Sequence, residues 1–241
     1  MKAITKQIPN FITCLNLVSG CIACVMALHN QPLYALIWII IAAVLDFFDG
    51  FLARLLKTYS PIGKDLDSLA DVVSFGVAPG MMVYWVLDAI SNPGSQHSLY
   101  SLGFFAFIIP ALSAVRLARF NNDTRQTDHF IGLPVPAHAL LWGSIVYFFH
   151  LHPDLLNGNP TILIGIGIIA ITAISLLLVS NINMFSLKIK SLAWKGNELR
   201  YVLVIVALAF LITLGFVGIA PTIIFYILLS WLTSNKKAEE N

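Results

Sequence analysis

The dominant pattern along the chain is a series of long apolar runs separated by short polar connections. Eight runs approach the length of about 20 residues that a helix needs to cross a bilayer. The last two are joined only by Val217 and Gly218, so they form either a tight hairpin or one broken helix. The pattern predicts an all-α, polytopic membrane bundle of about eight transmembrane helices. The runs cover roughly Phe11–Leu28, Leu33–Leu55, Ser68–Ile90, Tyr100–Phe120, Ala137–Leu151, Thr161–Val179, Tyr201–Phe216 and Ile219–Leu232.

The composition agrees with a membrane protein and excludes several other classes. Hydrophobic residues make up 58% of the 241 residues and charged residues 11%, whereas a soluble domain carries about 25% charged residues. No repeat or soluble segment interrupts the runs, so we expect residues 1–241 to form a single membrane domain. The start resembles a lipoprotein signal ending at Cys21, but apolar sequence continues past it to Leu28, so we expect this segment to be retained.

The basic residues predict how the bundle is oriented. All 14 lysines and arginines fall at the N-terminus, in or beside the even-numbered connections, or at the C-terminus, and the odd-numbered connections hold none. Cytoplasmic loops carry an excess of basic residues. We therefore expect both termini and the even connections to face the cytoplasm, with the protein in the inner, cytoplasmic membrane. The scattered basic residues form no aromatic-interleaved stretch, which excludes nucleic acid as a partner.

Four carboxylates stand out in this apolar setting, and they form two pairs. Asp46 and Asp49 are three residues apart, and Asp67 and Asp71 are four apart. On helices, both spacings place the two side chains on one face. Two such faces together make an oxygen-only cage, which suits a hard divalent cation such as Mg²⁺ or Mn²⁺.

The depth of these carboxylates favours a function over a structural role. Asp46 precedes Arg54 by eight residues, which places it about 12 Å deeper along the second helix. Asp67 and Asp71 lie near the start of the third helix, so the two pairs approach from adjacent antiparallel helices. Structural salt bridges with nearby basic residues are the alternative, but four carboxylates exceed what one deep arginine neutralises. Ionisable groups at such depth generally mark functional sites.

The spacing of the acidic residues resembles the signature of the CDP-alcohol phosphotransferases, which are integral membrane enzymes of phospholipid synthesis. Further segments between residues 8 and 138 resemble the branch of that family that uses serine as the acceptor. The signature residues are Asp46, Asp49, Gly50, Ala53, Arg54, Gly63, Asp67 and Asp71. The further segments are residues 8–10 with Thr13 and Asn16, 74–76, 78–80, 116–121 and 130–136.

The resemblance implies that the phosphatidyl group of CDP-diacylglycerol is transferred to the hydroxyl of L-serine, which gives phosphatidylserine and CMP. It implies that Asp46, Asp49, Asp67 and Asp71 hold Mn²⁺ or Mg²⁺, and that Asp71 is also the general base. The motif offers no serine, cysteine or histidine nucleophile, which favours direct displacement. A homodimer is implied as well. The residues implied for CDP-diacylglycerol binding are Asn10, Thr13, Gly50, Arg54, Ser60 and Gly63.

For the serine carboxylate we expect Arg116 and Arg119, near the cytoplasmic end of the fourth run, and for its ammonium Asn121 or Asp128. Anchoring of that helix at the headgroups is an alternative role for the two arginines. The same chemistry with glycerol 3-phosphate, inositol phosphate or an archaeal-type lipid donor remains open. A cation-coupled transporter is a further alternative, although no second copy of the acidic cluster appears in the other half of the chain.

Overall fold

The computed structural model describes residues 7–58, 61–91, 102–122, 129–185, 194 and 197–239 of the chain. The α-helices are α2 (Ile8–Leu28), α3 (Pro32–Leu55), α4 (Pro61–Asp71), α5 (Ala78–Ser91), α6 (Ile108–Asn122), α7 (Val135–Leu151), α8 (Pro160–Leu176), α9 (Glu198–Leu214) and α10 (Ile219–Glu239). A π-helix, η1 (Val72–Val77), joins α4 to α5. The 3₁₀ segments are η2 (Leu102–Phe107), η3 (Pro153–Leu156), η4 (Leu177–Val179) and η5 (Gly215–Gly218). Two strands, β1 (His129–Ile131) and β2 (Asn183–Phe185), complete the fold.

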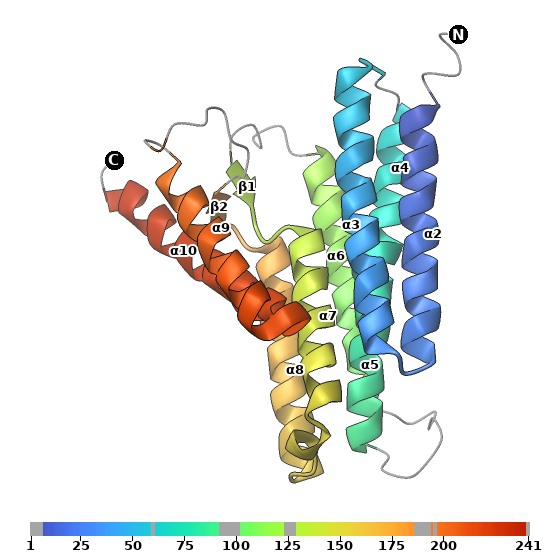
Figure 1. Cartoon of the computed structure of the whole chain (residues 1–241), viewed down its shortest axis with the longest axis vertical. Helices are drawn as coiled ribbons and strands as arrows, with labels where there is room; N and C mark the ends of the chain where they lie inside the picture. The colour runs from blue at the N-terminus through green and yellow to red at the C-terminus, as the bar shows by residue number, and fades with distance from the viewer. Residues whose placement is uncertain are drawn as a thin grey trace.

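The helices from α2 to α8 run up and down along the long axis of the molecule, as Figure 1 shows. Helix α2 begins and helix α3 ends at the same end of this bundle, and α4, α7 and α9 also begin toward that end. In the described residues, each apolar run of the sequence lies on helical structure between α2 and α10, and the expected helical bundle is confirmed. Only the β1–β2 pair departs from the expected all-α fold among the described residues.

The expected count of eight transmembrane helices is not confirmed by helix length alone. Within the described residues, six helical stretches are long and apolar enough to cross a bilayer, and α7 is a shorter apolar helix. One of the six joins α9, η5 and α10 into a single stretch. Figure 1 shows that α9 and α10 nevertheless lie side by side as a hairpin, whose turn packs against the middle of α7. Of the two alternatives for this region, the structure has the hairpin.

The hairpin turn is fixed by one buried serine. Ser144, on α7, has no exposed surface, and its hydroxyl lies 3.0 Å from the carbonyl oxygens of Phe216 and Val217. The same hydroxyl accepts a hydrogen bond from Ala220 N at 3.1 Å. Carbonyls and amides freed by a helix break must be satisfied by protein groups inside an apolar environment. Ser144 does this for the turn, and so ties the C-terminal hairpin to the bundle.

The bundle packs closely where small residues face one another. Gly20 on α2 lies so near Ser74 in η1 that an added Cβ would overlap the serine Oγ. Ala35, Ala42 and Ala23 are fully buried on α2 and α3, and small residues of this kind let helix backbones approach in membranes. This approach matters for function because α2, α3 and α4 carry most of the acidic motif and its neighbours.

Candidate active site

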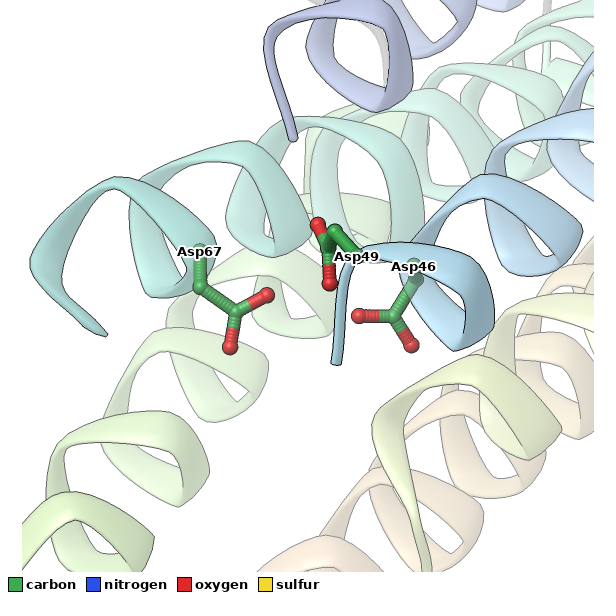
Figure 2. Close-up of side chains that lie close together, drawn as sticks. All are labelled: Asp46, Asp49 and Asp67. Atoms are coloured by element: carbon green, nitrogen blue, oxygen red, sulfur yellow. The ribbon is translucent and has the colours of Figure 1, made fainter. Parts of the chain in front are cut away.

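Three of the four motif carboxylates meet at one end of the bundle. Asp46 and Asp49 project from the last turns of α3, and Asp67 projects from α4. One oxygen from each lies within 4.8 Å of one oxygen from the others. Figure 2 shows the three carboxylates converging on a common space between the two helices. The prediction that the two helices bring their acidic faces together is therefore met for these three residues.

The donor set of this cluster fits a hard divalent cation. Its ligands are carboxylate oxygens alone, which Mg²⁺ and Mn²⁺ prefer. Asp49 is buried and the other two are half-buried, so repulsion among the three charges is poorly screened by water. The Asp67 Oδ1 atom is buried without a hydrogen-bond partner among the described residues, as expected for an oxygen reserved for a cation.

Asp71 lies one helical turn beyond Asp67 and is not part of the three-carboxylate group. It is 6% exposed, and Asn16 Nδ2 on α2 donates a hydrogen bond of 3.2 Å to its Oδ1. Asn16 is itself held in place because Ser74 Oγ donates to its backbone oxygen at 3.0 Å. The π-helix η1 begins immediately after Asp71, and π-helical turns often occur at functional sites. Asp71 is thus fixed separately from the cluster.

One cavity adjoins the cluster on the side of α2 and the α3–α4 connection, and we call it the Arg54 cavity. Its volume is about 250 Å³. Five of the six residues expected to bind CDP-diacylglycerol line it: Asn10, Thr13, Gly50, Arg54 and Gly63. The sixth, Ser60, lies outside the described residues. The structure therefore brings together positions that are up to 53 residues apart in the sequence, counted from Asn10 to Gly63.

One hydrogen bond and one glycine shape the Arg54 cavity. Thr13 Oγ1 donates a hydrogen bond of 2.6 Å to Asp49 Oδ2, which links the cavity wall to the carboxylate cluster. A Cβ on Gly50 would project toward the Arg54 guanidinium, whose nearest nitrogen lies 3.9 Å from that position. Gly50 therefore leaves the space beneath the arginine open for a ligand that approaches the backbone closely.

Lys64 is a cavity residue that sequence reasoning missed. Helix α4 includes Lys64, and its side chain lines the Arg54 cavity. Its Nζ donates a hydrogen bond of 2.6 Å to Asn121 O at the end of α6. Helix α4 begins at Pro61, and a proline in the first turn of a helix is the signal that would have placed Lys64 on a helix.

A second cavity of about 250 Å³, which we call the Arg116 cavity, adjoins the cluster on the side of α6 and α7. Arg116 is only 5% exposed, and its Cζ lies 5.3 Å from the centre of the Phe120 ring, a cation–π arrangement. The lining residues are Asp46, Asp67, Asp71, Arg116, Leu117, Phe120, Pro134, Val135 and Pro136. Asp67 lines both cavities, so the carboxylate cluster lies where they meet.

The other residues expected to bind serine do not line the Arg116 cavity. Arg119 is exposed, and its guanidinium donates to Val179 O at 3.2 Å. Asn121 Nδ2 donates to Ser68 Oγ at 2.7 Å, which ties the end of α6 to α4. Asp128 lies outside the described residues. Among the expected serine ligands in the described part of the chain, the structure thus brings only Arg116 to the carboxylates.

This bundle, with paired acidic helices and two adjoining cavities, has the architecture expected of a membrane phosphotransferase. Residues 6–177 match the family model described as CDP-alcohol phosphatidyltransferase, and the chain belongs to that family. The resemblance noted in the acidic motif is confirmed.

Several relatives of this chain carry the name CDP-diacylglycerol--serine O-phosphatidyltransferase. One from Helicobacter pylori strain J99 is 32% identical over 209 residues, which cover 84% of this chain and 81% of the relative. One from Methanocaldococcus jannaschii is 38% identical over 164 residues, 68% of this chain and 71% of the relative. One from Bacillus subtilis strain 168 is 34% identical over 155 residues, 63% of this chain and 80% of the relative.

Proposed function

We propose that this protein transfers the phosphatidyl group of CDP-diacylglycerol to the hydroxyl of L-serine and releases CMP. The serine oxygen attacks the phosphorus that carries the diacylglycerol, and the bond from that phosphorus to the CMP oxygen breaks. CMP leaves with the electron pair of that bond, and the serine hydroxyl proton passes to a carboxylate of the protein. The product is phosphatidylserine, which remains in the membrane.

The observation that carries this proposal is the meeting of two cavities at one carboxylate cluster. A transfer between two substrates requires a donor site and an acceptor site that share the reacting phosphorus. The Arg54 cavity and the Arg116 cavity share Asp67, and both adjoin the cluster. The relatives named for serine support serine as the acceptor. Two adjoining cavities also favour direct displacement, because they let serine attack the phosphorus while the CMP portion of the donor still occupies its own cavity.

Asp46, Asp49 and Asp67 would hold the divalent cation, Mn²⁺ or Mg²⁺, that the family resemblance implies. When bound, such a cation neutralises charge on the pyrophosphate and on the departing phosphate oxygen. Thr13 holds one oxygen of Asp49 through the 2.6 Å hydrogen bond. Asp71, outside this group, remains available for proton transfer, and its role as a fourth ligand stays a prediction.

The Arg54 cavity would receive the CDP portion of the lipid. Arg54 offers a planar, bidentate fork that suits a phosphate, and Lys64 offers a point charge beside it. Gly50 leaves room for the nucleotide against α3. Asn10, at the start of α2, and Gly63, at the start of α4, complete the wall on either side.

The Arg116 cavity would receive serine. Arg116 is buried in it and suits the carboxylate of an amino acid. Asp71 lines the same cavity and would accept the serine proton as the hydroxyl attacks. The Asn16 amide holds one oxygen of Asp71 and leaves the other for the proton. A phosphorylated acceptor demands more cationic groups than Arg116, the one basic residue that lines this cavity in the described part of the chain.

We further infer that the active site faces the cytoplasm in the cytoplasmic membrane, and that the protein forms a homodimer. The first inference is supported by Arg54, Lys57 and Lys64, which lie at the end of the bundle that holds both cavities. Cytoplasmic loops are enriched in such residues. The second rests on the resemblance to the family.

The test is CMP release by the purified protein with CDP-diacylglycerol and Mn²⁺, using serine, glycerol 3-phosphate and inositol phosphate in parallel. We expect release with serine and loss of about 100-fold or more in Asp71→Asn, because general-base catalysis contributes 10²–10⁴-fold. Asp154→Asn is the matched control, since Asp154 is exposed in η3 at the other end of the bundle. Release with another acceptor would replace serine, and no release with any acceptor would reject the transferase.

A further inference from the structure

The wall of the Arg116 cavity at residues 134–136 is the beginning of α7. The chain just before this wall is fixed through its backbone to the segment that follows α8. Gly132 N donates to Ile182 O at 2.8 Å, and Leu133 N donates to Leu177 O at 2.9 Å. The position of the wall therefore depends on the end of α8 and on the residues that follow it.

Gly132 makes this attachment unusually close. Its φ is +79°, and an added Cβ would lie 2.5 Å from Leu178 O and 3.0 Å from Ser180 O. Only glycine combines this conformation with such an approach to backbone oxygens. Arg119 binds the carbonyl of Val179 in the same turn at 3.2 Å. The carbonyls of η4 thus link the cavity wall to α6.

The same segment continues into a two-stranded pairing that reaches the C-terminal hairpin. Strand β1 pairs antiparallel with β2, with His129 opposite Phe185. Tyr226, on α10, is 7% exposed, and its hydroxyl donates a hydrogen bond of 3.0 Å to Phe185 O. The two aromatic rings also pack edge to face with centres 5.1 Å apart. We call β1, β2 and Tyr226 the clasp.

We infer that Tyr226 is a positioning residue for the acceptor: through the clasp, the C-terminal hairpin holds the wall of the Arg116 cavity in place. The kinetic consequence of this inference, a change in the KM for serine, rests on the proposed function. Helix α10 lies beyond residues 6–177, the part that matches the family model, so the hairpin acts on the catalytic region from outside it.

The clasp acts on one cavity and leaves the other alone. Among the described residues, the Arg54 cavity is lined by residues between Pro9 and Asp67, on α2, α3, α4 and the connection between the last two. None of these belongs to β1, β2 or α10. Loosening the clasp therefore raises the KM for serine and leaves the KM for CDP-diacylglycerol unchanged. General destabilisation would instead lower the amount of active enzyme and leave both KM values as they are.

The experiment compares Tyr226→Phe with Thr222→Val in the purified full-length protein. The first variant removes the hydroxyl that binds Phe185 O and keeps the ring. The second removes a hydroxyl one turn earlier on α10. In the described residues, this hydroxyl donates to Gly218 O, at the end of η5, at 2.8 Å. Steady-state KM values for both substrates are measured, together with hydrogen–deuterium exchange of peptides that cover residues 129–136.

In Tyr226→Phe we expect the serine KM to rise about fivefold, the factor that one neutral hydrogen bond contributes, and the 129–136 amides to exchange faster. Thr222→Val should change neither quantity. An unchanged serine KM, or a fall in kcat alone, overturns the inference while the proposed function stands. If the unmodified protein releases no CMP with serine, the proposed function fails. The exchange data then test the clasp alone: unchanged exchange in Tyr226→Phe contradicts the positioning role of Tyr226, and faster exchange supports it.

Discussion

At the scale of single residues, the carboxylate cluster depends on neighbours that orient its oxygens. Thr13→Val removes the 2.6 Å hydrogen bond to Asp49 and keeps the size of the side chain. Loss of such a partner typically weakens metal affinity 10–100-fold. We expect the Mn²⁺ concentration for half-maximal CMP release to rise about 10-fold, measured after chelation and metal titration. Thr172→Val, which removes a hydroxyl bound only within α8, is the control and should leave the titration unchanged.

Arg116 gives a second prediction at this scale. Arg116→Lys keeps the positive charge but loses the planar fork that binds a carboxylate through two parallel hydrogen bonds. We expect the serine KM to rise about 10-fold, one charge-assisted hydrogen bond being worth roughly 1.5–3 kcal/mol, while the KM for CDP-diacylglycerol stays constant. Steady-state kinetics with each substrate varied in turn measure both. Equal changes in the two KM values would contradict the assignment of Arg116 to the acceptor site.

The sequence predicted individual site residues unevenly, and helix geometry explains why. Asp46 and Asp49 were placed correctly on one face because a spacing of three has a fixed meaning on a helix. Arg116 and Arg119 share that spacing, yet of the two only Arg116 lines the cavity, because η4 lies beside Arg119 and offers it the carbonyl of Val179. Which of two helical neighbours meets a cavity depends on the packing of other helices, and no local pattern carries that information.

At the scale of elements, the close approach of α2 to η1 sets the distance between Asn16 and Asp71. Gly20→Ala would drive a Cβ into Ser74, lying 2.7 Å from its Cα. Overpacking of this kind costs about 1–3 kcal/mol. We expect a lower thermal midpoint of unfolding in detergent and a smaller active fraction. Gly165→Ala on α8 is the matched control, since nothing lies within 4 Å of its added Cβ. It should be neutral or slightly stabilising because alanine favours helix.

The elements themselves were largely predictable, with two informative exceptions. Long apolar runs predicted the helices because a bilayer requires helices of that length. The strands β1 and β2 contain three residues each, and their pairing joins residues far apart in the sequence, with His129 opposite Phe185 and Ile131 opposite Asn183. Such short strands leave no periodic signal. The π-helix η1, which packs against α2 and α6, was not predicted from the sequence either.

At the scale of the whole molecule, both cavities lie at the end of the bundle where the described basic residues gather. Lys57 follows α3 at this end, whereas Asn157 follows η3 at the other end, and both side chains are exposed. If basic connections stay in the cytoplasm, the two positions face opposite sides of the membrane. Substrates that are water-soluble and cytoplasmic, such as serine, would then reach the Arg116 cavity without crossing the bilayer.

Cysteine labelling tests this orientation in intact cells. The three natural cysteines are first replaced by alanine, and either Lys57→Cys or Asn157→Cys is then introduced. A membrane-impermeant maleimide should label position 157 in intact cells and position 57 only after the membrane is broken. The opposite result would show that both cavities face the outside of the cell, away from cytoplasmic serine. The proposed acceptor would then have to be supplied from outside. Labelling of both positions in intact cells would show that the connections of η3 and α3 lie on one side, which contradicts the up-and-down bundle itself.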